Sequence, residues 1–183
     1  MPVRSFRHDQ PDRCVVGTVG EPGQRTFYLQ ARTGSVVTSV VLEKTQVAAL
    51  ADQLDGMLDE VVRRSGGLAD VPAAAPTAVE DLAPLDLPLE EEFRVGELSL
   101  TWLGDDAQVE LVARAGEAAD PSDADEDERD TFAVRLSGAQ ARSFAARARA
   151  VVAAGRPPCP FCAQPLDPSG HLCPRQNGFH RRS

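Results

Sequence analysis

The hydrophobic pattern of the chain changes period between residues 42 and 47. Before this point, residues 13–19 and 25–32 carry apolar runs or apolar/polar alternation, and residues 35–42 are rich in β-branched side chains, so three strands are predicted. From about residue 45 to residue 64, apolar positions recur every three or four residues, which predicts an amphipathic helix. Such a helix must bury its apolar side against the strands, and this indicates an α+β fold.

The second half of the chain repeats this order of elements. The predicted elements are alternating segments at 93–102, 109–113 and 132–136 and a helix at about 138–153. We expect a turn at Gly96-Glu97 inside the first of these segments, and Ser137 with Gln140 forms a capping-box pattern at the start of the helix. The same spacing separates Leu42, Gln46 and Leu50 as separates Leu136, Gln140 and Phe144. Any junction of a strand and a helix can produce this match, but the repeated order of elements favours a duplication.

The predicted organisation has four segments: a first βββα unit at 1–65, a Pro/Ala-rich acidic linker at 66–90, a second βββα unit at 91–154, and a zinc knuckle with a basic tail at 155–183. Within the second unit, residues 117–130 contain eight acidic residues and almost no apolar ones. Burial cannot offset the entropy of ordering such a run, so a disordered loop is expected there.

Three of the four cysteines lie close to the C-terminus, at Cys159, Cys162 and Cys173. A Cys-x-x-Cys pair that is followed after a loop by an imidazole and a third thiolate matches the ligand set of a tetrahedral zinc ion. The fourth ligand is either His171, in a compact His-x-Cys arrangement with Cys173, or His180 near the end of the chain. Chain ends tend to fray, so His171 is favoured as the fourth ligand.

Two other roles of the cysteines fit less well. A thioredoxin-like redox pair would begin a helix, which the prolines at 160, 165 and 168 disfavour, and it would leave Cys173 unexplained. A catalytic zinc would need a water ligand and a nearby carboxylate base, and Asp167 is the single carboxylate in the loop. We also find no phosphate-binding glycine loop and no nucleophile or metalloprotease motif, so a structural zinc in a non-enzymatic protein is expected.

Charge and hydropathy limit the partners. The net charge of -9 disfavours general binding to nucleic acids or anionic membranes, and no apolar run is long enough to span a bilayer. Clustered cysteines next to histidine and the lack of a signal-peptide pattern favour a cytoplasmic location. The fourth cysteine, Cys14, is expected to be a buried thiol. The tail is nevertheless basic and carries aromatic residues, so a nucleic-acid-binding knuckle is the alternative function. Its charged and aromatic residues are Arg156, Arg175, Arg181, Arg182, Phe161 and Phe179.

The segments GRPPCPFC (155–162) and GHLCPRQNG (170–178), with RTFYLQA (25–31) and EKTQ (43–46), carry a family resemblance. The chain resembles an uncharacterised, repeat-containing family of Actinobacteria that ends in a zinc-knuckle-like tail. The resemblance implies a cytoplasmic accessory role beside kinase-like and phosphatase-like proteins, and it implies that a histidine at position 180 is commonly missing, which supports His171. We therefore expect a zinc-binding adaptor or regulatory protein that engages a protein partner.

Overall fold

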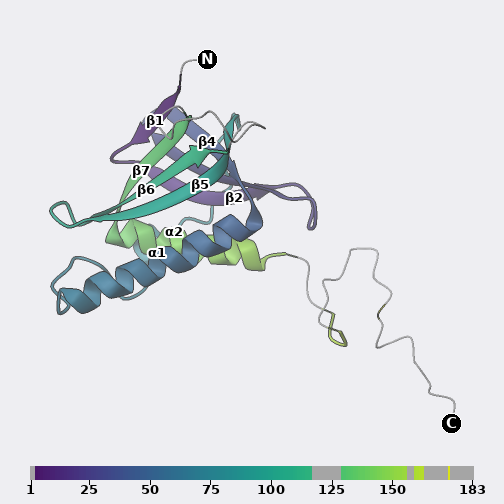
Figure 1. The fold of residues 1–183 in the computed structure, drawn as a ribbon. Coiled ribbons are helices and arrows are strands. Elements are labelled where there is room, and N and C mark those ends of the chain that lie inside the picture. The colour runs from purple at the N-terminus through teal and green to yellow at the C-terminus, as the bar shows by residue number, and fades with distance from the viewer. Residues whose placement is uncertain (1–2, 117–128, 156–158, 163–172, 174–183) are drawn as a thin grey trace, which may run out of the picture.

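The computed structural model describes residues 3–116, 129–155, 159–162 and 173. It has the expected α+β class, with a single seven-stranded mixed sheet and two α-helices that lie together on one side of it (Figure 1). Within the described residues, neither helix is long and apolar enough to cross a membrane. The predicted disordered loop at 117–130 lies outside the described residues except for Arg129 and Asp130.

The secondary-structure elements closely follow the hydrophobic pattern of the sequence. Their bounds are β1 Ser5–His8, β2 Arg13–Val19, β3 Thr26–Thr33, β4 Val36–Leu42, α1 Lys44–Arg64, a 3₁₀ turn at Thr77–Val79, β5 Glu91–Leu103, β6 Gln108–Ala115, β7 Thr131–Ser137 and α2 Gly138–Ala153. The sequence pattern did not predict β1, because four residues are too few to show a period.

The strands are ordered β1-β7-β6-β5-β4-β3-β2 in the sheet. Neighbouring strands are antiparallel except at β4–β5 and β1–β7, which are parallel. The two edge strands, β1 and β2, are consecutive in the chain. His8 at the end of β1 reaches strands β3 and β4, with its ring nitrogens 2.8 Å from Thr33 Oγ1 and 2.9 Å from Thr38 Oγ1. The sheet is therefore curled, so that edge strand β1 comes close to β3 and β4.

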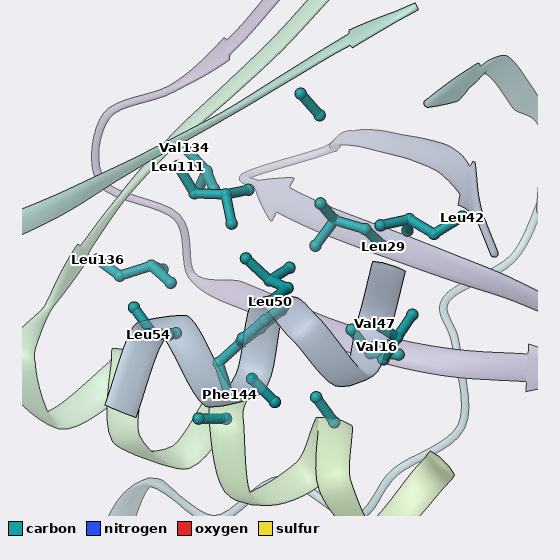
Figure 2. Packing of buried hydrophobic residues seen from close by; sticks show 14 of the residues in the cluster. Val16, Leu29, Leu42, Val47, Leu50, Leu54, Leu111, Val134, Leu136 and Phe144 are labelled. Carbon is teal, nitrogen blue, oxygen red and sulfur yellow. The ribbon is translucent and has the colours of Figure 1, made fainter. Parts of the chain in front are cut away.

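The hydrophobic core lies between one face of this sheet and the two helices (Figure 2). The strand register places Val16, Leu29 and Val40 side by side on that face. Leu50 and Leu54 of α1 and Phe144 of α2 pack against the same cluster, and each is at most 2% exposed. Burying large aliphatic and aromatic side chains contributes about 1.5–3 kcal/mol each, so this cluster is the main source of stability.

One expected turn is wrong. β5 continues through Gly96-Glu97 as a single strand, with a shift in its register against β6 between Val95 and Glu97. A Cβ atom on Gly96 would lie 2.4 Å from the Cα of Gly116. The glycine thus allows two backbones to approach closely at a bulge, which is the other common use of glycine in a strand.

The predicted capping box forms at the start of α2, and a similar one forms at the start of α1. Gln140 Oε1 accepts a hydrogen bond from Ser137 N–H at 3.0 Å, and Gln46 Oε1 accepts one from Glu43 N–H at 2.8 Å. Each glutamine also donates across to another segment, Gln46 to the carbonyl of Val95 and Gln140 to that of Pro11. The two strand-to-helix junctions therefore make matching local contacts, one beside β5 and the other beside the end of β1.

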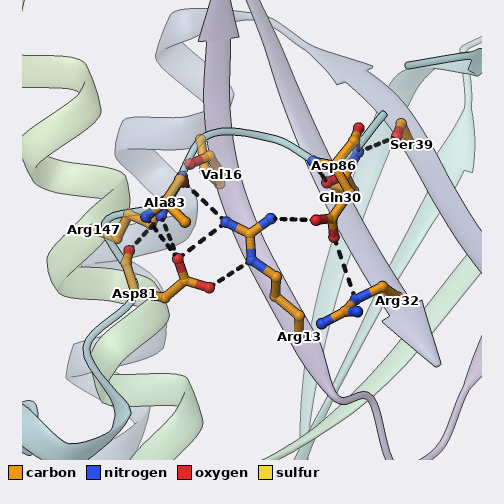
Figure 3. A network of polar contacts seen from close by, with 9 residues as sticks. All are labelled: Arg13, Val16, Gln30, Arg32, Ser39, Asp81, Ala83, Asp86 and Arg147. Atoms are coloured by element: carbon orange, nitrogen blue, oxygen red, sulfur yellow. Dashed lines mark hydrogen bonds and ion pairs between the residues drawn. The ribbon is translucent and has the colours of Figure 1, made fainter. Parts of the chain in front are cut away.

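The segment between α1 and β5 is bound along edge strand β2 by a polar network (Figure 3). Arg13 of β2 donates to both carboxylate oxygens of Asp81, at 2.5 and 3.0 Å, and Arg147 of α2 donates to the carbonyls of Val16 and Ala83. A Cβ atom on Gly17 would lie 2.6 Å from Leu85, so the segment also packs closely on the strand. These contacts cover an edge that would otherwise expose unpaired backbone groups.

Candidate metal centre

The structure brings three of the four predicted metal ligands together. The sulfur atoms of Cys159, Cys162 and Cys173 all lie within 4.8 Å of one another. Cys159 and Cys173 are buried, at 5% and 3% exposure, and Cys162 is half-buried. The Cys-x-x-Cys turn presents two sulfurs on one side, and Cys173 returns to them from fourteen residues further along.

The spacing of the sulfurs distinguishes between two kinds of cross-link. Cys159 Sγ and Cys173 Sγ are 3.8 Å apart, and all four cysteines are free thiols. A disulfide would need about 2.05 Å. Around a zinc ion with Zn–S bonds of about 2.3 Å, tetrahedral geometry separates two sulfurs by about 3.8 Å. The cluster therefore has the dimensions of a metal-thiolate site.

The backbone of the turn favours the thiolate form at Cys159. Phe161 N–H donates to Cys159 Sγ at 3.4 Å. Burial acts to raise the pKa of Cys159, but hydrogen bonds from the backbone N–H groups of Cys162 and Phe161 and from the thiols of Cys162 and Cys173 together lower it. A thiolate is the form that binds a metal, so this turn is suited to hold a soft cation.

The fourth ligand lies outside the described residues. Both candidates, His171 and His180, fall there, so the choice between them stays a prediction. Three thiolates supply enough soft donors for zinc, and a closed fourth position would make the site structural. Within the described residues, this group is the one set of three or more metal-binding side chains whose ligand atoms converge.

The remaining cysteine has a different environment. Burial raises the pKa of Cys14 to about 12, because no compensating donor offsets the loss of water around a thiolate. Cys14 lines a cavity of about 660 Å³ beside the network of Arg13, Asp81 and Arg147. Cys14 is half-buried and packs against the hydrophobic core, which supports its expected role as a structural thiol.

Sequence reasoning did not find the Arg13 network. Arginine and aspartate at positions 13, 81 and 147 carry no recognisable spacing, because the three residues come from a strand, a connecting segment and a helix. Charged side chains line the cavity beside the network, yet the guanidinium of Arg13 already binds Asp81, Asp86 and the carbonyl of Ala83. The network therefore holds the connecting segment against β2 and α2.

The chain is thus an α+β protein with a three-cysteine cluster of metal-site dimensions at its C-terminal end. More particularly, a family model described as "Protein of unknown function (DUF3090)" matches residues 6–173, and the chain belongs to that family. No curated protein and no solved structure matches the chain. The matched span begins in β1 and ends on the third cysteine, so it includes both the sheet and the cluster.

Proposed function

We propose that this chain is a zinc-binding adaptor or regulatory protein in which the metal holds the C-terminal segment in a fixed shape. The observation that carries the proposal is the convergence of three cysteine sulfurs within 4.8 Å. Cys159, Cys162 and Cys173 bind the zinc ion as thiolates, and His171 completes the tetrahedron. His171 lies within the span that the family model matches, whereas His180 lies beyond it.

A structural role for the metal follows from its ligand set. Three thiolates and one imidazole leave no open position for water or substrate, and closed sites of this kind stabilise a local fold. Among the described residues of this segment, the one large apolar side chain, Phe161, is 53% exposed and so adds little hydrophobic burial. The zinc ion thus takes the place of a hydrophobic core, and the ordered segment supplies a surface for a protein partner.

The two helix-ending units of the body support an internal duplication. In the first unit, β3 pairs antiparallel with β2 and β4, and in the second unit β6 pairs antiparallel with β5 and β7. Leu29 of β3 is opposite Val40, and Leu111 of β6 is opposite Val134. The last strand of each unit also has a parallel neighbour, which is β5 for β4 and β1 for β7. We assign the first unit to 1–65 and the second to 91–154, joined by the segment at 66–90.

The zinc assignment is tested by metal analysis of the full chain. We expect one zinc ion per chain in the wild type, and loss of zinc from Cys159→Ser and Cys173→Ser. Cys14→Ser is the matched control and keeps its zinc, because Cys14 is far from the cluster in sequence and packs against the core of the sheet-and-helix body. His171→Ala should lower zinc affinity while His180→Ala does not. Wild-type protein that binds no zinc under reducing conditions contradicts the proposal.

The adaptor role is tested by recovery of a partner from native cells. A kinase-like or phosphatase-like protein is the class that the family resemblance implies. We expect the full chain to recover it, and Cys159→Ser or a chain lacking residues 156–183 to lose it. A partner that binds the shortened chain equally well would remove the cluster from the interaction. Salt-sensitive binding to RNA or DNA would instead favour the alternative nucleic-acid role.

A further inference from the structure

A groove that no element of the described chain covers lies beside the C-terminal half of α1. It has a volume of about 780 Å³ and runs between this helix and the turn that joins β5 to β6. Met57, Val61 and Trp102 form its apolar walls, and Leu68 at its margin is 92% exposed. These side chains together form a contiguous apolar groove, and apolar grooves with a polar rim are typical of surfaces that bind another segment.

The rim of this groove is acidic. Asp70 lines it, and Asp105 and Asp106 occupy the turn between two further lining residues, Gly104 and Ala107. These three aspartates form no ion pair within the part of the chain that the structure describes. Arg64 and Glu60 also line the groove, but Arg64 is paired with Glu60, as is the neighbouring Arg63. The excess charge is therefore negative, and it complements a cationic segment with an apolar anchor.

The sequence of this chain contains such a segment. Residues 174–183 carry three arginines and one phenylalanine and no acidic residue, in a chain whose net charge is -9. This run lies beyond the span of the family model, which ends at residue 173. Phe179 is the one aromatic side chain of this run, and its neighbouring arginines carry the charge opposite to that of the rim aspartates.

The chain is long enough for this contact. The end of α2 lies beside the start of α1 (Figure 1), because a Cβ atom on Gly155 would be 3.3 Å from Lys44 Nζ. The groove is about 26 Å further along α1, taking about 1.5 Å per residue from Lys44 to Val61. Cys159 and Cys173 lie side by side, so the path from Gly155 to Phe179 that crosses between their sulfurs covers ten residue steps. At about 3.3 Å per residue these span about 33 Å.

We propose that residues 174–183 bind in the groove formed by Met57, Val61 and Trp102 of the same chain. Phe179 is the apolar anchor, and Arg175, Arg181 and Arg182 interact with the acidic rim. The contact goes beyond the zinc proposal, since every residue that makes it lies outside the cysteine cluster. It gives the chain an intramolecular contact between its C-terminus and the end of its first helix.

The groove contains its own reporter, because Trp102 is the single tryptophan of the chain. In the full-length protein we compare the wild type with a variant that combines Arg175→Gln, Phe179→Ala, Arg181→Gln and Arg182→Gln. We expect Trp102 emission to move to longer wavelength and its quenching by acrylamide to increase in the variant. Raising the ionic strength should move the wild type in the same direction, because salt screens exposed charge pairs.

Two controls make the outcome specific. Phe161→Ala removes another exposed aromatic residue of the C-terminal region and should leave Trp102 emission unchanged. Combined Asp70→Asn, Asp105→Asn and Asp106→Asn should reproduce the emission of the tail variant, and joining both sets should add nothing further. A synthetic peptide of residues 174–183 should restore wild-type emission when added to the tail variant.

Identical emission from the wild type and the tail variant at low salt overturns the proposal. So does a wild-type emission that changes on dilution, since that result would place the segment of a second copy in the groove. The zinc content of every variant should equal that of the wild type. A chain that binds zinc but shows no change at Trp102 therefore separates failure of this contact from failure of the proposed function.

Discussion

The sheet-and-helix body and the cysteine cluster are stabilised in different ways. The body completely buries side chains such as Leu29, Leu54 and Phe132 between the sheet and two helices. Among the described residues of the cluster, the buried side chains are the sulfur-bearing ones of Cys159 and Cys173. The body therefore depends on the hydrophobic effect and the cluster on its ligands, so a change in one should leave the other intact.

The largest expected effect comes from the core of the body. Phe144→Ala should lower the free energy of unfolding by about 4 kcal/mol, because it leaves a cavity where α2 meets the sheet. Chemical denaturation followed by circular dichroism measures this change. Val36→Ala is the control, since Val36 is 59% exposed and its loss should cost at most about 0.5 kcal/mol. Loss of zinc from folded Phe144→Ala would show that the two regions are coupled.

The next effect concerns the polar network around Arg13. Asp81→Ala should cost about 2 kcal/mol at pH 7, because Arg13 is only 8% exposed and would lose its bidentate partner. The neighbouring Glu80 is exposed, and within the described residues its side chain forms no hydrogen bond or ion pair, so Glu80→Ala should be close to neutral. An equal loss in both variants would mean that general acidity, and not the network, holds the segment on β2.

The hydrogen bond from Arg13 is the main reason that the pKa of Asp81 is lowered. A carboxyl with a lowered pKa in the folded state stabilises the fold above its ordinary pKa, and this contribution is lost as the pH falls through the lowered value. The difference between wild type and Asp81→Ala should therefore shrink in acid. A difference that stays constant down to the acid unfolding transition would argue against the ion pair.

Two glycines should respond in opposite directions. Gly17→Ala places a methyl group 2.6 Å from the Leu85 side chain and should cost about 1–2 kcal/mol through overpacking. Gly56 lies inside α1 with open space around its Cβ position, so Gly56→Ala should stabilise the protein by about 0.5–1 kcal/mol. Thermal unfolding of both variants measures the two shifts. A stabilised Gly17→Ala would show that Leu85 does not pack on β2 in solution.

A smaller effect is expected from pH at His8, whose ring links β1 to β3 and β4. Burial lowers the pKa of His8 below its ordinary value of 6.5. The unfolded chain then binds more protons than the folded one below that value, so stability is full above about pH 6.5 and falls as the solution is acidified. His8→Asn should be less stable at pH 7.5 but should lose less on going to pH 5.5. Parallel pH profiles of variant and wild type would exclude His8 as the cause.

The last prediction compares the two kinds of thiol directly and involves no loss of stability. With the pKa of Cys14 raised to about 12, this thiol should not react with a thiol reagent at pH 8 until the protein unfolds. After removal of metal by a chelator, the three cluster cysteines should react rapidly. Counting reactive thiols before and after denaturation tests this difference. Four fast thiols in the folded chain would contradict the buried position of Cys14.

The sequence was a reliable guide wherever a structural signal is local. The predicted strand at 13–19 coincides with β2, and the predicted helix at about 138–153 coincides with α2. The capping-box pattern at Ser137 and Gln140 forms as expected. In each case, the signal depends on residues within one or two turns of one another, and the backbone hydrogen bonds that satisfy it are equally local.

Non-local partners could not be predicted in this way. Gly96 was expected in a turn, but it lies in a continuous strand because of the close approach of Gly116 from β6. Asp55 lies off the apolar positions of α1, yet it forms an ion pair with Arg142, whose side chain is 6% exposed. A helical pattern shows that a side chain points away from the sheet, but it does not show that a second helix covers that side.

The sequence by itself determined the α+β class, most of the elements and the cysteine pattern, because hydrophobic period, capping residues and ligand spacing are written in neighbouring positions. Only the tertiary structure decided that β1 and β5 pair in parallel with β7 and β4, that the segment from α1 to β5 lies along β2, and that three sulfurs converge. Each of these depends on contacts between residues distant in the chain, which are selected by the free energy of the whole packed molecule and not by any one segment.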